Sequence, residues 1–117
     1  MGMRVHVVKK REEYGNYETF NWKMEEFRSL LNALDCDVCG EEYSNRFEVY
    51  LPTYEYAMEY LKDINKGVTE FENIDVDYVK DCLESLDYGT IEEVIEAMQT
   101  FYDERDKSSE YIEFVAW

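Results

Sequence analysis

Three cysteines and one histidine are the side chains of this chain with the widest chemical repertoire. Cys36 and Cys39 have the spacing of a zinc-binding or redox pair, but a structural zinc site needs four ligands. The remaining soft ligands, Cys82 and His6, do not form a second closely spaced pair. A redox pair opens a helix, where the dipole lowers the thiol pKa, whereas this pair follows a predicted helix and leads into a strand. We therefore predict ordinary thiols, a histidine on a strand face and no metal site.

The carboxylates do not form a specific motif either. Asp75 and Asp77 match the first two ligand positions of a calcium loop, but Val79 and Lys80 stand where the next ligand and the glycine belong. Adjacent acidic pairs arise by chance among 28 acids, and the glycines are too isolated to form a phosphate loop. The sequence predicts no catalytic residue, no cofactor and no enzyme. A catalyst or small-ligand binder would need His6 or the cysteines to converge on a pocket.

Charge is the feature of this chain that stands out. Its 117 residues carry 28 acidic and 12 basic side chains, a formal net charge of −16, and 45% of the residues are hydrophobic, enough for a packed core. Residues 1–11 are basic, whereas residues 68–104 contain twelve acids and Lys80 alone among cations. A direct nucleic-acid binder needs a basic surface, so that class is not expected.

Helical spacing predicts that the acids of residues 68–104 lie on outward helix faces. Like charges three or four residues apart destabilise a helix by a few tenths of a kcal/mol per pair, a cost that the core or a partner's cations must offset. A solvated face that keeps the protein soluble is one interpretation, and a docking surface for a basic protein is the sharper one. Tyrosines interleaved with acids add aromatic anchors to such a surface. The predicted partner-binding residues are Asp77, Asp81, Glu84, Glu92, Glu96, Asp103, Tyr56 and Tyr60.

The elements that position these residues follow from hydrophobic periodicity. In chain order we expect a strand over 3–10, a helix over 20–34, a hairpin of 36–39 with 46–51, helices over 54–66, 77–86 and 91–105, and a strand over 110–117. Polar residues at the helix starts indicate N-caps. The expected caps are Thr19 or Asn21, then Thr53, then Asp75 or Asp77, and finally Thr90 in a capping box with Glu93.

This order predicts one α+β domain over residues 1–117. It reads β-α-β-β-α-(αα)-β, the order of a ferredoxin-like split βαβ unit with a two-helix insert before the last strand. Alternating polar and apolar strands favour a mixed or antiparallel sheet of three or four strands, with helices on one face. The last strand is expected to lie inside the sheet, beside the first.

Several features favour a cytoplasmic protein. The cysteine count is odd, whereas small secreted domains pair their cysteines. The first residues contain no apolar run of signal-peptide length, and no stretch approaches the length that spans a membrane. We expect reduced thiols and no membrane partner.

Two functional hypotheses from different classes follow. The first is a non-enzymatic acidic module that docks a basic protein surface, either as an immunity-type protein that plugs a nuclease cleft or as a nucleic-acid mimic whose carboxylates occupy phosphate sites. The second is a structural or assembly subunit that forms a homo-oligomer through its sheet, because Tyr111, Val115 and Trp117 share one face of the last strand.

Overall fold

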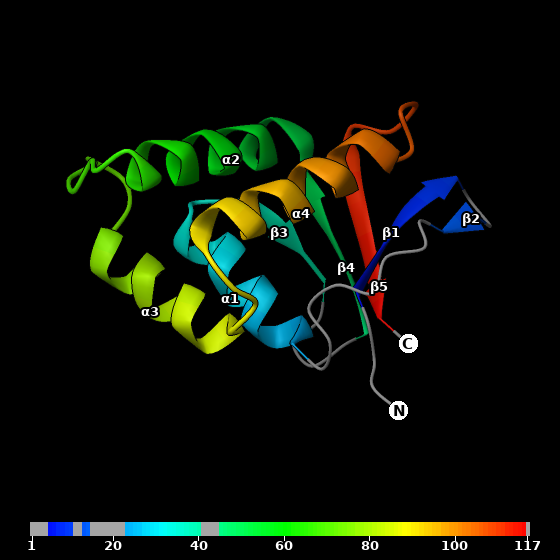
Figure 1. The fold of residues 1–117 in the computed structure, drawn as a ribbon. Helices are drawn as coiled ribbons and strands as arrows, with labels where there is room; N and C mark the ends of the chain where they lie inside the picture. Colours follow the sequence, from blue (N-terminus) through cyan, green and yellow to red (C-terminus); the bar gives the residue numbers. More distant parts are fainter. Residues whose placement is uncertain (1–4, 11–12, 15–22, 41–44, 117) are drawn as a thin grey trace.

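An antiparallel sheet forms one layer of the molecule (Figure 1). The computed structural model describes residues 5–10, 13–14, 23–40 and 45–116. Its three longer strands lie side by side, with a two-residue strand at either edge, in the order β2-β1-β5-β4-β3. They are β1 (Val5–Lys10), β2 (Glu13–Tyr14), β3 (Val38–Cys39), β4 (Arg46–Tyr50) and β5 (Tyr111–Ala116). Together with four helices this sheet confirms the predicted α+β class.

The last strand lies at the centre of the sheet, paired on one side with β1 and on the other with β4. Phe114 is thus in register with Val7 of β1 and Phe47 of β4. The predicted pairing of the first and last strands is confirmed. The ferredoxin-like arrangement is not confirmed, because two strands, β5 and β4, separate β1 from β3, whereas a split βαβ unit places a single strand between them.

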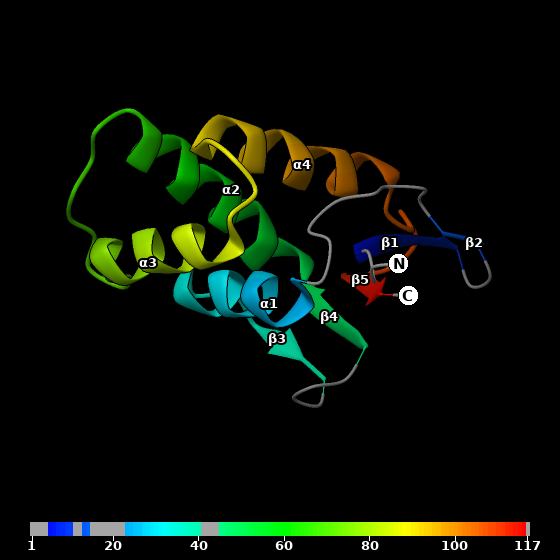
Figure 2. The same ribbon diagram turned by 60° about the horizontal axis from the view of Figure 1, so that its bottom comes forward.

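Four helices pack beside the sheet, in two pairs. They are α1 (Met24–Ala33), α2 (Leu51–Asn65), α3 (Val76–Leu86) and α4 (Ile91–Glu104). Helix α3 packs on α1 and α4 packs on α2, while α1, α2 and α4 also contact strands (Figures 1 and 2). The α3 helix of the predicted two-helix insert therefore lies farthest from the sheet, with α1 beneath it.

The helices and the sheet meet in an aromatic core around Phe114. Its ring centroid lies 5.1 Å from Phe27 of α1, 5.9 Å from Tyr54 of α2 and 5.2 Å from Phe101 of α4. The neighbouring strand contributes Phe47, at 5.3 Å. All five side chains are buried. Because Phe114 contacts three helices at once, α1, α2 and α4 cover the same face of the sheet.

Local capping signals place two helix starts correctly. The Asp75 carboxylate accepts hydrogen bonds from the first amides of α3, and Thr90 and Glu93 form the predicted capping box of α4. These caps fix where the acidic helices begin. The predicted caps Thr19 and Asn21 lie outside the described residues.

The predicted N-cap of α2 is wrong. The helix begins at Leu51, two residues before Thr53, and Tyr50 is its N-cap. Pro52 is accommodated in the first turn, because the amide it lacks has no helical partner there. The Thr53 hydroxyl instead donates to the Tyr50 carbonyl and accepts from the Asp37 amide, which ties α2 to the segment before β3.

Candidate functional site

Helices α3 and α4 present their acids to solvent. Eleven of the twelve carboxylates of residues 68–104 are exposed, and Glu104 is half-buried. The apolar side chains of both helices face inward, as their spacing predicts. Every acid predicted to bind a partner is therefore on the surface.

The structure divides the six predicted acids between two places. Asp77, Asp81 and Glu84 lie on α3, where Asp81 helps to line a shallow pocket of about 270 Å³ against Glu25 and Glu26 of α1. The three α4 acids belong to the other helix pair, because α4 packs on α2. The two groups are therefore not a single cluster around one pocket.

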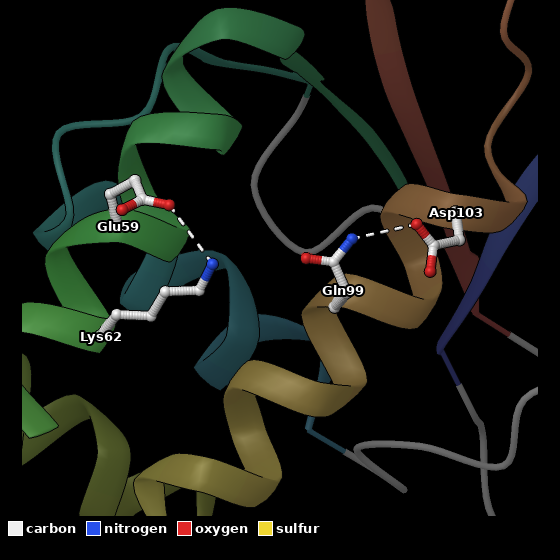
Figure 3. A network of polar contacts seen from close by, with 4 residues as sticks. All are labelled: Glu59, Lys62, Gln99 and Asp103. Atoms are coloured by element: carbon white, nitrogen blue, oxygen red, sulfur yellow. Dashed lines mark hydrogen bonds and ion pairs between the residues drawn. The ribbon is translucent and has the colours of Figure 1, made fainter.

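The α4 acids border the line where α4 meets α2. Glu92 accepts a hydrogen bond from Asn65 at the end of α2, at 3.5 Å. Asp103 accepts one from Gln99 on its own helix, at 3.0 Å (Figure 3). Glu96 is exposed between them. This row of acids follows one side of the α2–α4 pair.

The two predicted aromatic anchors have different surroundings. Tyr56 is 64% exposed on α2. Tyr60, one turn later, is half-buried, packs edge-on against Phe71 at 5.3 Å and accepts a hydrogen bond from Asn73. Asn73 also donates to Asp35 at the end of α1. Tyr60 thus holds the α2–α3 loop in place, and Tyr56 is the anchor that faces solvent.

A groove of about 380 Å³ runs between α2 and α4 and contains Tyr56. Its lining combines carboxylates, two tyrosines and apolar side chains: Pro52, Glu55, Tyr56, Met58, Glu59 and Lys62 from α2, and Gln99 and Tyr102 from α4. Figure 3 shows Glu59 paired with Lys62 on α2, and Gln99 paired with Asp103 on α4. The groove brings the predicted anchor Tyr56 together with two carboxylates, Glu55 and Glu59, that were not among the predicted acids.

Sequence reasoning singled out Tyr56 and missed the rest of the groove lining. The residues contributed by α2 recur at three- and four-residue intervals from Pro52 to Lys62, which marks one helix face. That pattern was available in the sequence. The sequence does not show that this face of α2 lies beside Gln99 and Tyr102, because that contact depends on the packing of two helices about 40 residues apart.

A tyrosine–carboxylate bond crosses the groove. The Tyr102 hydroxyl on α4 donates to the Glu55 carboxylate on α2. This bond raises the pKa of Tyr102, because the phenol must keep its proton to donate, and partial burial acts in the same direction. The Arg105 guanidinium lies 4.0 Å from the centroid of the Tyr102 ring and opposes this shift in pKa. A cation, an aromatic ring and a carboxylate are therefore already in contact at the end of the groove.

Cys36 and Cys82 are not activated as nucleophiles. Burial, with a contribution from Asp35, raises the pKa of Cys36 to about 12, and the thiol contacts the Thr53 carbonyl. Burial also raises the pKa of Cys82, while Cys39 is exposed. A thiol with a raised pKa is a poor nucleophile at neutral pH. In the part of the chain that the structure describes, no three His, Cys, Asp or Glu side chains are placed to hold a metal ion.

Comparisons with protein-family models, curated proteins and solved structures give no match to this chain. None of the helices in the described ranges combines the length and the apolar character that crossing a membrane requires. The function is therefore inferred from the surface and the groove themselves.

Proposed function

We propose that this protein is a small acidic, non-enzymatic binding module of the cytoplasm that docks onto a basic surface of another protein. The observation that carries this proposal is the exposure of eleven carboxylates on one 37-residue segment whose single cation is Lys80. Two ion pairs within the described residues, Arg46–Glu113 and Lys62–Glu59, involve none of the six predicted acids of α3 and α4. The field of these helices is thus available to a cationic partner.

The physical benefit of such docking is clear from the helices themselves. Asp77, Asp81 and Glu84 repel one another at helical spacing, as do Glu92 and Glu96. A partner's lysines and arginines would relieve this repulsion, and opposite fields would speed association. Binding of this kind weakens steeply as salt rises, because the exposed charges are screened.

Two kinds of basic partner fit the proposal. An immunity-type protein would plug the cationic cleft of a nuclease, and a nucleic-acid mimic would place carboxylates where a nuclease binds phosphates. Both versions predict inhibition of a nuclease. They differ in what competes: DNA or RNA added in excess displaces a mimic from its partner, whereas an immunity-type protein that also contacts surfaces outside the phosphate sites resists that displacement.

The test uses three variants that each lose three negative charges. One carries Asp77→Asn, Asp81→Asn and Glu84→Gln on α3, and a second carries Glu92→Gln, Glu96→Gln and Asp103→Asn on α4. The matched control carries Asp37→Asn, Glu48→Gln and Glu110→Gln, which are exposed acids on or beside the strands. Each variant is immobilised and exposed to lysate of the source organism at low and moderate salt.

The proposal predicts capture of one basic protein by the parent and by the control, and its loss from at least one helix variant that remains folded. Equal capture by all four proteins would mean that the acids are only a solvated surface. If the parent retains no basic protein at low salt, the docking function is wrong.

A second candidate function rests on the sheet face opposite the helices. Of the apolar trio predicted there, Tyr111 is half-buried, Val115 is buried and Trp117 lies outside the described residues. Tyr50 and Tyr111 form an aromatic pair there, with ring centroids 5.5 Å apart and Tyr50 36% exposed. We propose homo-oligomerisation through this face as the alternative. A dimer that persists in light scattering at high salt would favour it, because self-association through the acidic helices is opposed by repulsion.

A further inference from the structure

The groove between α2 and α4 has the composition of a receptor for one particular side chain. From it we infer that an arginine of the basic partner inserts between Tyr56 and the carboxylates of Glu55 and Glu59. This inference rests on the proposed function, since it names the residue that anchors the docking. A guanidinium has flat, weakly hydrated faces that stack on aromatic rings and an edge of donors that matches a carboxylate. The groove offers both kinds of surface within about 380 Å³.

Tyr56 is the ring that remains available for stacking. The other tyrosine of the groove, Tyr102, already contacts Arg105, and its ring is parallel to that of Tyr54, with the two centroids 6.4 Å apart. Tyr56 is 64% exposed, and within the described residues it has no ring or cation partner. The contact between Arg105 and Tyr102 also shows that this end of the molecule accommodates a guanidinium on a tyrosine.

Both carboxylates of the groove already have partners within the chain: Glu55 accepts a hydrogen bond from the Tyr102 hydroxyl, and Glu59 holds a cation. The Lys62 ammonium lies 3.3 Å from Glu59 inside the lining (Figure 3). Partly exposed pairs of this kind are weak, so an incoming guanidinium with two parallel donors can displace the ammonium from Glu59. Lys62 therefore competes with the partner's arginine. Its removal is expected to strengthen binding about fivefold, the change that corresponds to about 1 kcal/mol.

The experiment uses small probes, so that the local site is separated from the general field of the protein. N-acetyl-arginine amide and N-acetyl-lysine amide, each with one positive charge, are titrated into the ¹⁵N-labelled full chain and followed by NMR. We expect shifts at Glu55, Tyr56, Glu59 and Gln99, with the arginine probe bound at least threefold more tightly. Tyr56→Ala is expected to lower that affinity at least fivefold.

Matched controls exist on α3. Tyr78 is 53% exposed, so Tyr78→Ala removes an equivalent exposed ring, and Lys80→Gln changes the net charge by as much as Lys62→Gln. Only the groove variants should alter affinity for the arginine probe. Equal effects of the two lysine variants, equal binding of the two probes, or shifts spread over α3 would each overturn the inference.

The same variants separate this inference from the docking function. If salt-sensitive capture of a basic protein is retained by Tyr56→Ala and Glu59→Gln, docking stands and the arginine groove is wrong. If the arginine probe binds the groove but the parent captures no basic protein, the groove stands as a guanidinium site and the docking function is wrong.

Discussion

Substitution of Tyr54 tests whether one buried hydrogen bond fixes the spacing of α2 and α4, and with it the width of the groove. Its side chain is fully buried, and its hydroxyl donates to the carbonyl of Met98 on α4, at 2.7 Å. Burial raises the pKa of Tyr54 well above its ordinary value, so the hydroxyl stays protonated and able to donate at neutral pH. Tyr54→Phe removes the oxygen and leaves the ring.

The expected cost is about 1 to 1.5 kcal/mol of unfolding free energy. A buried hydrogen bond contributes about 1 kcal/mol net, and an acceptor left unsatisfied would cost more. Helical geometry gives the Met98 carbonyl a second donor in the Tyr102 amide, which limits the penalty. The ring contacts with Tyr102 and Phe114 remain. Urea denaturation should therefore show a midpoint lowered by about 0.5 to 1 M with an unchanged slope.

Tyr56→Phe is the matched control, because it deletes the same oxygen from an exposed tyrosine of the same helix. Its free energy of unfolding should stay within about 0.5 kcal/mol of the parent. If the two variants unfold at the same urea concentration, the bond to Met98 contributes nothing measurable, and the width of the groove must be set by apolar packing and by the other bonds between α2 and α4, Tyr102–Glu55 and Asn65–Glu92.

Two further predictions concern stability. Because burial raises the pKa of Cys36 from 9.0 to about 12, the unfolded chain releases that proton first. The stability that depends on the neutral thiol is therefore complete below pH 9 and is lost as pH rises toward about 12, at up to about 1.4 kcal/mol per pH unit. In urea titrations at increasing alkaline pH, the free energy of unfolding of Cys36→Ala should fall less steeply with pH than that of the parent. Parallel dependence on pH in the two proteins would contradict the assignment. Thr90→Ala removes the side-chain half of the α4 capping box and should cost about 1 kcal/mol, whereas Thr69→Ala in the exposed α2–α3 loop should be neutral in the same titration.

The parts of the fold that were predictable depend on neighbouring residues. Asp75 and the pair of Thr90 and Glu93 fix helix starts through bonds that span two or three residues, and the sequence alone reveals them. Apolar spacing likewise predicts the helices and the longer strands. The N-cap predicted at Thr53 was wrong because Pro52 also fits inside a first helical turn. The local residues are therefore compatible with a start of α2 either at Leu51 or after Thr53.

The order of strands in the sheet could not be predicted in the same way. Alternation in β5 shows which of its residues face the core, but the same alternation fits any neighbour. The pairing of β5 with β1 was predicted, but its second neighbour, β4, was not; Phe114 of β5 packs there among Phe27, Phe47 and Phe101, which come from three different elements. Contacts of that range leave no periodic signal in the chain.

Tyr56 and Tyr60 show the same limit at the candidate site. They lie one turn apart on α2 and have the same spacing from neighbouring acids, so the sequence predicts the same role for both. The α2–α3 loop then closes over Tyr60 through Phe71 and Asn73, and α4 forms a wall beside Tyr56. Tyr60 therefore stabilises the α2–α3 loop, and Tyr56 remains exposed in a groove that also contains carboxylates. Helical spacing identifies which residues share a face, but the elements that pack beside that face decide which of them a partner can reach.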